Sequence, residues 1–514
     1  MENILDWIEV GKLSAERDDN LSSYFYDAGV LNNVIKSPTS FLVLGRKGAG
    51  KTAVFKYLSE NKDQFIEPDD ILIPLSFEDY NWNIHSLLKD SDKAVSLAYK
   101  QSWLLVMLIE SVKAYSNWFI EKGKKVPKEI SNCNKLLEKL FDSPIPSIGK
   151  IVSRKILSLS KLSLPKAGLD MEEGNFDSID FGGGEVSFNE VKQEKTLQTH
   201  LSENIHNLID YLESSLEKVS AECPTVYICF DKVDEAWDAA SFSASKPVIT
   251  GLIASSDSLT TTKKNKIRPI VFLREDIFDV LDLNDSNKLR EDCGELLHWN
   301  ARSLHSLILI RIKHFAKKHN IEIPQTLDDL FDRKEMRQRT KPFKYLLKRT
   351  MMRPRDLISM TSKVIKNMID KVEDPFSEEE LHYEKLEAAS IYEAEPIYSD
   401  WLRKEVLEEW QVQMPIIEDL FNAIQNFGST NFNRKELYTE LEKLVPDVTE
   451  EGVKEYLRFL FNNSIIGFKL GNSKEWKFKC FYPSQGYLDS SEYRVHEGLV
   501  RALNLRESRE KDNN

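Results

Sequence analysis

The chain has 514 residues and a formal net charge of −13, with 41% hydrophobic and 30% charged residues. This composition is typical of a globular protein, and the length fits about two to four domains. The negative charge argues against a protein that coats nucleic acid by bulk charge, although it leaves room for a local basic patch.

The cysteines, the N-terminus and the most apolar run further limit the class of protein. The five cysteines, at positions 133, 223, 229, 293 and 480, form no C-x-x-C pair, so the sequence predicts no zinc site. The N-terminus has no basic leader, and the most apolar run, around Trp103 to Ile109, is shorter than the roughly 20 residues that cross a bilayer. We therefore expect a cytoplasmic protein without a membrane segment.

Residues 1–40 form a polar lead-in, in which the stretch from Ser14 predicts a helix that continues through Tyr24 and Phe25. The apolar run Phe41–Leu44 then leads into a segment that fits the phosphate-loop pattern G-x-x-x-x-G-K-[ST]. The segment after it has helical spacing and no breaker. A strand, a glycine turn and a helix N-terminus in this order direct backbone N–H groups at a phosphate.

The pattern assigns roles within this loop. Lys51 can reach the β- and γ-phosphates and so take part in catalysis, and the Thr52 hydroxyl can ligate Mg²⁺. We expect the nucleotide to be bound by the loop and the first helical turn, namely Gly45, Arg46, Lys47, Gly48, Ala49, Gly50, Lys51, Thr52 and Ala53. The alternative is a glycine-rich turn that matches by chance.

The next segments predict the scaffold of the same domain. Ile71–Leu75 predicts a second strand, and its Pro74 indicates an edge position or an irregular strand. Residues 97–120 predict a long helix, and the leucines and isoleucines from Leu197 to Leu216 predict an amphipathic one. Between them, residues 142–196 predict a mobile insertion or a small hairpin, because they are rich in proline, serine and glycine.

A second chemical element follows the apolar run Val226–Phe230. A buried parallel strand that ends in an acid can hold magnesium, so we assign Asp231 to the metal. We expect the end of this strand to lie next to the end of the strand before the phosphate loop, so that both meet at one triphosphate and its metal. Hydrolysis also needs a group that orients water, for which Asp234 and Glu235 are both candidates. The alternative is an ordinary strand followed by an acidic helix start.

A third strand, Pro269–Leu273, ends at Arg274. A cation at this position could contact the terminal phosphate and act in catalysis. Alternatively, Arg274 pairs with Glu275, Asp276 or a neighbouring helix. A further helix, 303–318, completes the predicted nucleotide domain, 41–332.

A basic segment, residues 333–355, opens the predicted helical lid and linker, 333–411. It permits three interpretations: a lid over the nucleotide, a solvated helix face or a nucleic-acid contact. We favour the lid, since Pro354 suits the first turn of a helix and would place Arg353 and Arg355 to bind the nucleotide. The acidic stretch Phe376–Glu395 predicts a solvated linker with helices.

Residues 412–505 predict three helices and a hairpin, the order of a winged helix, with a disordered tail at 506–514. The helices are Ile416–Phe427, one that starts at Asn433, and Thr449–Asn463. The third helix carries Glu450, Glu451 and Glu455, which is poor for phosphate contact. We therefore favour a structural or partner-binding module over a DNA reader.

Six segments together carry a family resemblance: Ser14–Arg17, the loop GRKGAGKT at 45–52, FDKVDE before Trp237, FLRED at 272–276, RPRD at 353–356 and the terminal winged helix with Tyr493–His496. With these motifs nearly the whole chain resembles a prokaryotic P-loop ATPase family allied to the STAND and KAP NTPases, in the AAA+/ORC-like branch. The resemblance implies an α/β fold: a P-loop NTPase core with a parallel sheet, a helical lid and a C-terminal winged helix.

The same resemblance implies ATP and Mg²⁺ as cofactors and a nucleotide-dependent switch that self-associates. Relatives are common in bacterial antiphage defence loci beside a separately encoded effector, which would then be a partner. One position departs from the family, because Lys232 stands where relatives often have a second acid. Slow or partner-dependent ATP hydrolysis follows from this departure. The alternatives are a DNA-binding motor or loader, with nucleic acid as a less favoured partner, and a nucleotide-binding scaffold without turnover.

Overall fold

The computed structural model describes residues 3–76, 95–141, 195–236, 242–262, 266–374, 381–471, 473 and 475–506. They belong to two compact units. Unit 1 comprises Met1–Ala28, Lys47–Ala53 and His298–Asn514, and unit 2 comprises Gly29–Arg46 and Val54–Leu297. The predicted insertion lies outside the described residues except for 195 and 196, as does the predicted tail except for Arg506.

Unit 2 is built on a five-stranded parallel sheet with the order β2-β3-β4-β1-β5. The strands are β1 (Leu42–Gly45), β2 (Ile71–Ser76), β3 (Val226–Asp231), β4 (Ile267–Arg274) and β5 (Gly294–Leu296). Every residue of β1 and β3 is buried, as expected for strands covered on both faces. The predicted edge position of the proline-containing strand β2 is confirmed.

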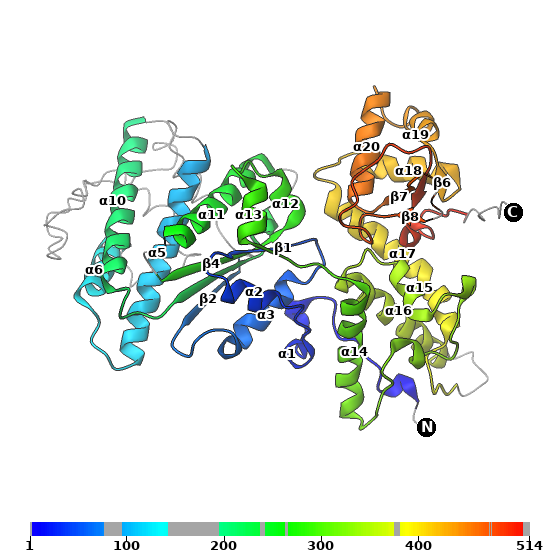
Figure 1. Ribbon diagram of the computed structural model, residues 1–514, viewed down its shortest axis with the longest axis horizontal. Coiled ribbons are helices and arrows are strands. Elements are labelled where there is room, and N and C mark those ends of the chain that lie inside the picture. Colours follow the sequence, from blue (N-terminus) through cyan, green and yellow to red (C-terminus); the bar gives the residue numbers. More distant parts are fainter. Residues whose placement is uncertain are drawn as a thin grey trace. The chain divides into compact units, whose positions relative to one another are not determined.

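Helices cover both faces of this sheet (Figure 1). The helices in this part of the chain are α2 (Val30–Lys36), α3 (Lys51–Glu60), α5 (Val95–Glu121), α6 (Lys128–Phe141), α10 (Lys195–Val219), α11 (Phe242–Thr262), α12 (Glu275–Val280) and α13 (Ser286–Cys293). Of these, α6 and α10 pack against α5. On one face Phe230 of β3 packs on Trp103 of α5. On the other face Phe272 of β4 packs on Phe55 of α3. Because side chains alternate along a strand, these two contacts assign every strand residue to a face.

The helical part of unit 1 contains α1 (Leu21–Tyr24), α14 (Ala301–Lys318), α15 (Pro342–Lys348), α16 (Pro354–Val372) and α17 (Ala388–Trp410). The prediction that a helix starts at Pro354 is confirmed. Helices α16 and α17 pack side by side, and their apolar residues belong to one core together with the C-terminal elements.

The C-terminal elements are α18 (Ile417–Phe427), β6 (Asn431–Phe432), α19 (Arg434–Leu441), α20 (Glu450–Asn462), β7 (Ile466–Lys469), β8 (Trp476–Lys477) and β9 (Tyr493–Val495). The three predicted helices are present, and Asn433 and Glu436 form the reciprocal bonds of a capping box. The predicted hairpin is β7 with β8. The sequence did not predict β9, which lies between β6 and β7 in an antiparallel sheet.

Two expectations about local structure were wrong. The stretch after Ser14 forms two short helices, η2 (Ala15–Arg17) and α1, because the chain breaks at Asp18 to bury that carboxylate against Arg311 and the Tyr24 hydroxyl. The end of the predicted solvated linker is the start of α17. There Glu395 is buried because its carboxylate pairs with Arg349 at 2.9 Å.

Candidate functional site

The sheet of unit 2 changes its winding direction between two adjacent strands. The chain leaves β1 towards β2 at one edge of the sheet, whereas it leaves β4 towards β5 at the other edge. Ligands of open parallel sheets bind at such a switch point, outside the carboxyl ends of the strands. The register pairs Gly45 at the end of β1 with Arg274 at the end of β4. The topology therefore places the first glycine of the loop and the predicted catalytic arginine side by side at the switch point.

Asp231 lies at the end of β3, one strand further along the sheet. It is 2% exposed, and alternation places it on the sheet face that Phe272 shares with α3. We expected the ends of β1 and β3 to be neighbours, but β4 lies between them. The two strand axes are consequently about 10 Å apart, which is twice the spacing of adjacent strands.

Arg274 is paired with acids of its own unit. Its guanidinium donates to both carboxylate oxygens of Asp276, at 3.1 and 2.7 Å, and lies 3.9 Å from Asp234. The structure therefore brings together Arg274 and Asp234, one of the two candidates for orienting water. Glu235 follows in the short helix η6 (Val233–Ala236), and its side chain lies outside the described part of the structure.

Lys232, the departure from the family pattern, has a positive φ of 59°. This left-handed conformation costs conformational free energy in any residue that has a Cβ, and backbone strain of this kind is concentrated at functional sites. The residue turns the chain immediately after Asp231 and directs it into η6.

Arg46, the second residue of the loop, belongs to unit 2 and lies 3.9 Å from Glu275. The same carboxylate accepts a hydrogen bond from Arg290 at 2.9 Å. Glu275, which directly follows Arg274, thus links Arg46 at the start of the loop to Arg290 of α13.

The remainder of the loop belongs to unit 1. Gly48 and Gly50 have φ angles of +79° and +102°, which residues with a Cβ rarely adopt. At Gly48 a Cβ would also lie 3.1 Å from Cβ of Arg355. The helix α3 then begins at Lys51 and includes Thr52 and Ala53, so these three residues form its N-terminal turn.

Three consecutive carbonyl groups of the loop accept hydrogen bonds from elsewhere in unit 1. Arg353 Nη1 donates to Lys47 O at 3.1 Å, the Arg355 backbone N–H donates to Gly48 O at 3.4 Å, and Trp299 Nε1 donates to Ala49 O at 2.8 Å. These bonds fix the orientation of the peptide planes in the loop. Sequence reasoning missed Trp299, which carries no motif and lies just before α14.

The two predicted lid arginines have different surroundings. Arg353 is buried and pairs with Asp356 at 3.0 Å and with Glu409 at 2.7 Å. Burial lowers its pKa, but the two carboxylates outweigh burial, so the pKa lies above its ordinary value. Arg355 keeps a third of its side chain exposed and pairs with Glu405 at 3.2 Å. Arg355 is thus the better placed of the two to contact a ligand, while Arg353 holds the loop.

Three acids of α17 lie beside Lys47 of the loop and the two arginines that we assigned to a lid. Glu405 and Glu408 lie 3.6 and 3.5 Å from Lys47 Nζ, and Glu409 pairs with Arg353. We missed these acids at the sequence level, although their spacing of three and four residues puts them on one helix face.

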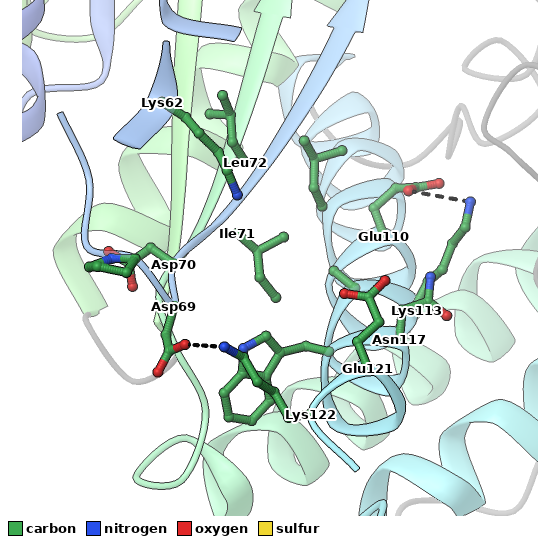
Figure 2. A pocket seen from close by; sticks show the side chains of 14 residues that line it. Lys62, Asp69, Asp70, Ile71, Leu72, Glu110, Lys113, Asn117, Glu121 and Lys122 are labelled. Atoms are coloured by element: carbon green, nitrogen blue, oxygen red, sulfur yellow. Dashed lines mark ion pairs between the residues drawn. The ribbon is translucent and has the colours of Figure 1, made fainter. Parts of the chain in front are cut away.

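A pocket of unit 2 lies at the opposite end of the sheet (Figure 2). It lies beside the start of β2 and the C-terminal half of α5, and the pairs Asp69–Lys122 and Glu110–Lys113 line it. Burial raises the pKa of Glu110. Because the pocket adjoins the amino end of a parallel strand, it is separate from the site at the carboxyl ends.

Within the described ranges, no group of three or more histidine, cysteine, aspartate or glutamate side chains is arranged to hold a metal. No helix in the described part of the chain combines the length and hydrophobicity that a bilayer crossing requires.

Comparisons with known proteins find similarities to a family model, to a curated protein and to a solved structure. The model of the FunZ-associated C-terminal helical domain matches residues 302–407. The "Putative transposon gamma-delta 80.3 kDa protein" of Escherichia coli K12 is 26% identical over 522 aligned positions, which cover 96% of this chain and 67% of that protein. The crystal structure of Cdc6p from Pyrobaculum aerophilum is similar with a TM-score of 0.30 and 11% identity, over 95% of this chain and 96% of that chain. The fold itself is α/β, with the strand, loop and helix of a P-loop NTPase core at the switch point of its parallel sheet.

Proposed function

We propose that this protein is an ATPase in which the bound nucleotide controls self-association or a separately encoded partner. The observation that carries the proposal is the set of three bonds from Arg353, Arg355 and Trp299 to the carbonyl groups of the phosphate loop. A ligand that moves the loop must also move these donors, and they lie just before α14 and at the start of α16. Such a linkage is what a switch needs, because a ligand shifts a conformational equilibrium only through its differential affinity for the two states.

We propose a magnesium–ATP complex as the ligand of this site. The positive φ angles of Gly48 and Gly50 and the held carbonyl groups suit a loop that binds phosphate through its N–H groups. Lys51 and the N-terminus of α3 would bind the β- and γ-phosphates, and Thr52 and Asp231 would hold the magnesium ion. When bound, the ion neutralises charge on the phosphates.

Turnover in this proposal depends on two further groups. Arg274 would stabilise charge on the terminal phosphate, and Asp234 or Glu235 would orient the attacking water. Since Lys232 replaces the usual second acid, we propose slow or partner-dependent hydrolysis. A partner is also supported by the name of the matched family, which describes a FunZ-associated domain. A role in antiphage defence rests on the family resemblance alone.

The decisive experiment measures the mass of the protein in solution, by size exclusion with light scattering, with and without ATP and Mg²⁺. We expect the nucleotide to change the assembly or the hydrodynamic radius of the wild type but not of Lys51→Ala. The matched control is Lys56→Ala, which removes a lysine one turn later in the same helix and should respond like the wild type. A wild type whose size and shape ignore the nucleotide contradicts the proposal.

A DNA-binding ATPase is the second candidate, favoured by one observation. Of the basic segment, Arg349 and Arg353 are buried in ion pairs, but the following six side chains are exposed: Arg333, Lys334, Arg337, Arg339, Lys341 and Lys344. An exposed basic surface can contact phosphates without reading sequence. The third candidate, a scaffold without turnover, predicts ATP binding with no release of phosphate.

A further inference from the structure

We infer that Glu405 sets how strongly this protein distinguishes ATP from ADP, by competing with the terminal phosphate for Arg355. The inference rests on the proposed nucleotide site and adds a specificity-determining residue to it. Glu405 lies on α17, outside every motif that the sequence analysis singled out.

The geometry gives Glu405 two cationic partners. Its Oε2 atom lies 3.2 Å from Arg355 Nη1 and 3.6 Å from Lys47 Nζ, so a single carboxylate oxygen faces both. Only 20% of the Glu405 side chain is exposed, and about a third of Arg355. The pair is therefore partly shielded from solvent but can rearrange without unfolding its surroundings.

Competition follows from the chemistry of the guanidinium group. Arg355 is anchored beside the loop, because its own N–H donates to Gly48 O. A carboxylate and a phosphate are both good acceptors for the same planar donors. An arginine that binds the terminal phosphate must give up part of its bond to Glu405. ADP lacks that phosphate, so binding of ADP leaves the ion pair intact.

The helix α17, which carries Glu405, also contacts the C-terminal elements, so a change in the Glu405–Arg355 pair can affect them. At the other end of α17, Glu395 pairs with Arg349, which also pairs with Glu497 of η9 (Glu497–Leu499) at 3.3 Å. The Ser399 side chain accepts a hydrogen bond from the Ala502 backbone at 2.9 Å. Release of Glu405 thus removes one contact between α17 and α16, while Glu409 keeps its pair with Arg353 and the other end of α17 stays attached to the C-terminal elements.

The experiment titrates the full-length protein with ATP and with ADP, each with Mg²⁺, by calorimetry. Glu405→Gln keeps the shape of the side chain and removes its charge. We expect ATP to bind about 2–5-fold more tightly than to the wild type, which is the strength of a partly exposed ion pair, and ADP to bind with unchanged affinity. The matched control is Asp400→Asn, which removes the charge of an exposed acid on the same helix that pairs with Lys404 at 2.7 Å, and it should change neither affinity.

Two additional variants separate competition from a general effect on folding. In the Arg355→Ala background, Glu405→Gln should change the ratio of the two affinities by a smaller factor than in the wild type, since Lys47 is then the remaining cationic partner of Glu405. Glu405→Asp keeps the charge but shortens the reach, so it should shift the ratio in the same direction by a smaller factor.

The outcomes distinguish the two levels of the proposal. If the wild type binds neither nucleotide, the proposed function fails. If the wild type binds ATP but Glu405→Gln leaves the ratio of affinities unchanged, tightens both nucleotides equally or weakens ATP, the role of Glu405 is overturned and the proposed function stands.

Discussion

Arg353 donates a hydrogen bond from Nη1 to the carbonyl oxygen of Lys47, at 3.1 Å, from a position where its side chain is almost fully buried. The same nitrogen lies 2.7 Å from Glu409 of α17. The guanidinium of Arg353 therefore has three acceptors: two carboxylates and a carbonyl of the loop. Because these acceptors lie on different segments, the buried arginine holds the loop, the start of α16 and α17 in one arrangement.

Replacement of Glu409 by alanine is therefore expected to destabilise unit 1. The variant would leave Arg353 buried with one carboxylate fewer, and breaking a buried pair from one side costs about 3–5 kcal/mol. The measurement is chemical denaturation followed by tryptophan fluorescence. Glu408→Ala is the control, because Glu408 is 70% exposed and its loss should cost at most about 1 kcal/mol. Equal losses for the two variants would contradict a supporting role for the buried pair.

Asp231→Asn tests the metal assignment. The amide has the shape of the carboxylate but lacks the charge that a hard cation prefers, so the gain in ATP affinity that Mg²⁺ provides should disappear. Affinity measured in EDTA should stay within about twofold of the wild type, and turnover should fall on the order of 10²-fold. Asp282→Asn, at a surface position with 85% exposure, serves as the control. If Asp231→Asn retains the full magnesium dependence, Asp231 is not a metal ligand.

Much of this site could be predicted from the sequence because its parts are local. The loop, the acid that ends an apolar strand and the proline at the start of α16 are short patterns with a direct physical cause. The order of the strands in the sheet, in contrast, depends on contacts between residues that are far apart in the sequence. The sequence indicated that Gly45 and Asp231 lie near each other, but only the fold shows that β4 separates them.

The supporting contacts could not be predicted for the same reason. Trp299 reaches Ala49 across 250 positions of sequence, and Glu409 reaches Arg353 across 56. No period or motif marks such partners. The break at Asp18 has a similar origin, since the carboxylate is buried against Arg311 of α14, and this tertiary pair overrides local helix preference.

Arg274 and Asp234 are expected to act as a coupled pair in hydrolysis. Arg274→Ala should lower turnover on the order of 10²-fold or more while ATP affinity changes little, since its main role would be in the transition state. Asp234→Asn should also lower turnover. Because the two side chains lie 3.9 Å apart, the double variant should lose less than the two single losses combined. Strictly additive losses, or an Arg274→Ala variant with normal turnover, would favour a purely structural pair of Arg274 with Asp276.

The stability of unit 1 should fall on acidification because of His496. This side chain is fully buried, and burial, reinforced by Arg349 and Arg353, lowers its pKa to about 3. The ordinary pKa of histidine is about 6.5, so between pH 6.5 and 3 the unfolded chain binds a proton that the folded chain does not. Stability is then fully present above pH 6.5 and decreases by up to about 1.4 kcal/mol for each unit below it.

The check is urea denaturation at several pH values between 7.5 and 4.5, for the wild type and for His496→Asn. The groups around the ring are Cys480, whose sulfur lies 3.8 Å from Nε2, the Gly498 N–H, which donates to Nδ1, and the rings of Phe478 and Phe481. The variant should be less stable at neutral pH but should lose less stability than the wild type on acidification. Parallel curves for the two proteins would assign the acid sensitivity to other groups.

The last prediction concerns nucleic acid. The third helix of the C-terminal elements, α20, pairs its two cations with its own acids, Lys454 with Glu451 at 2.6 Å and Arg458 with Glu455 at 3.1 Å. A helix with this charge pattern offers little to a phosphate backbone, so we expect duplex DNA to bind only weakly at physiological salt, with a dissociation constant in the non-specific range of about 10⁻⁴–10⁻⁶ M. Fluorescence anisotropy with labelled duplexes at several salt concentrations measures both the affinity and the salt slope. Nanomolar binding, with a slope that becomes shallower in a Lys341→Glu and Lys344→Glu double variant, would favour the DNA-handling ATPase over the partner-controlling switch.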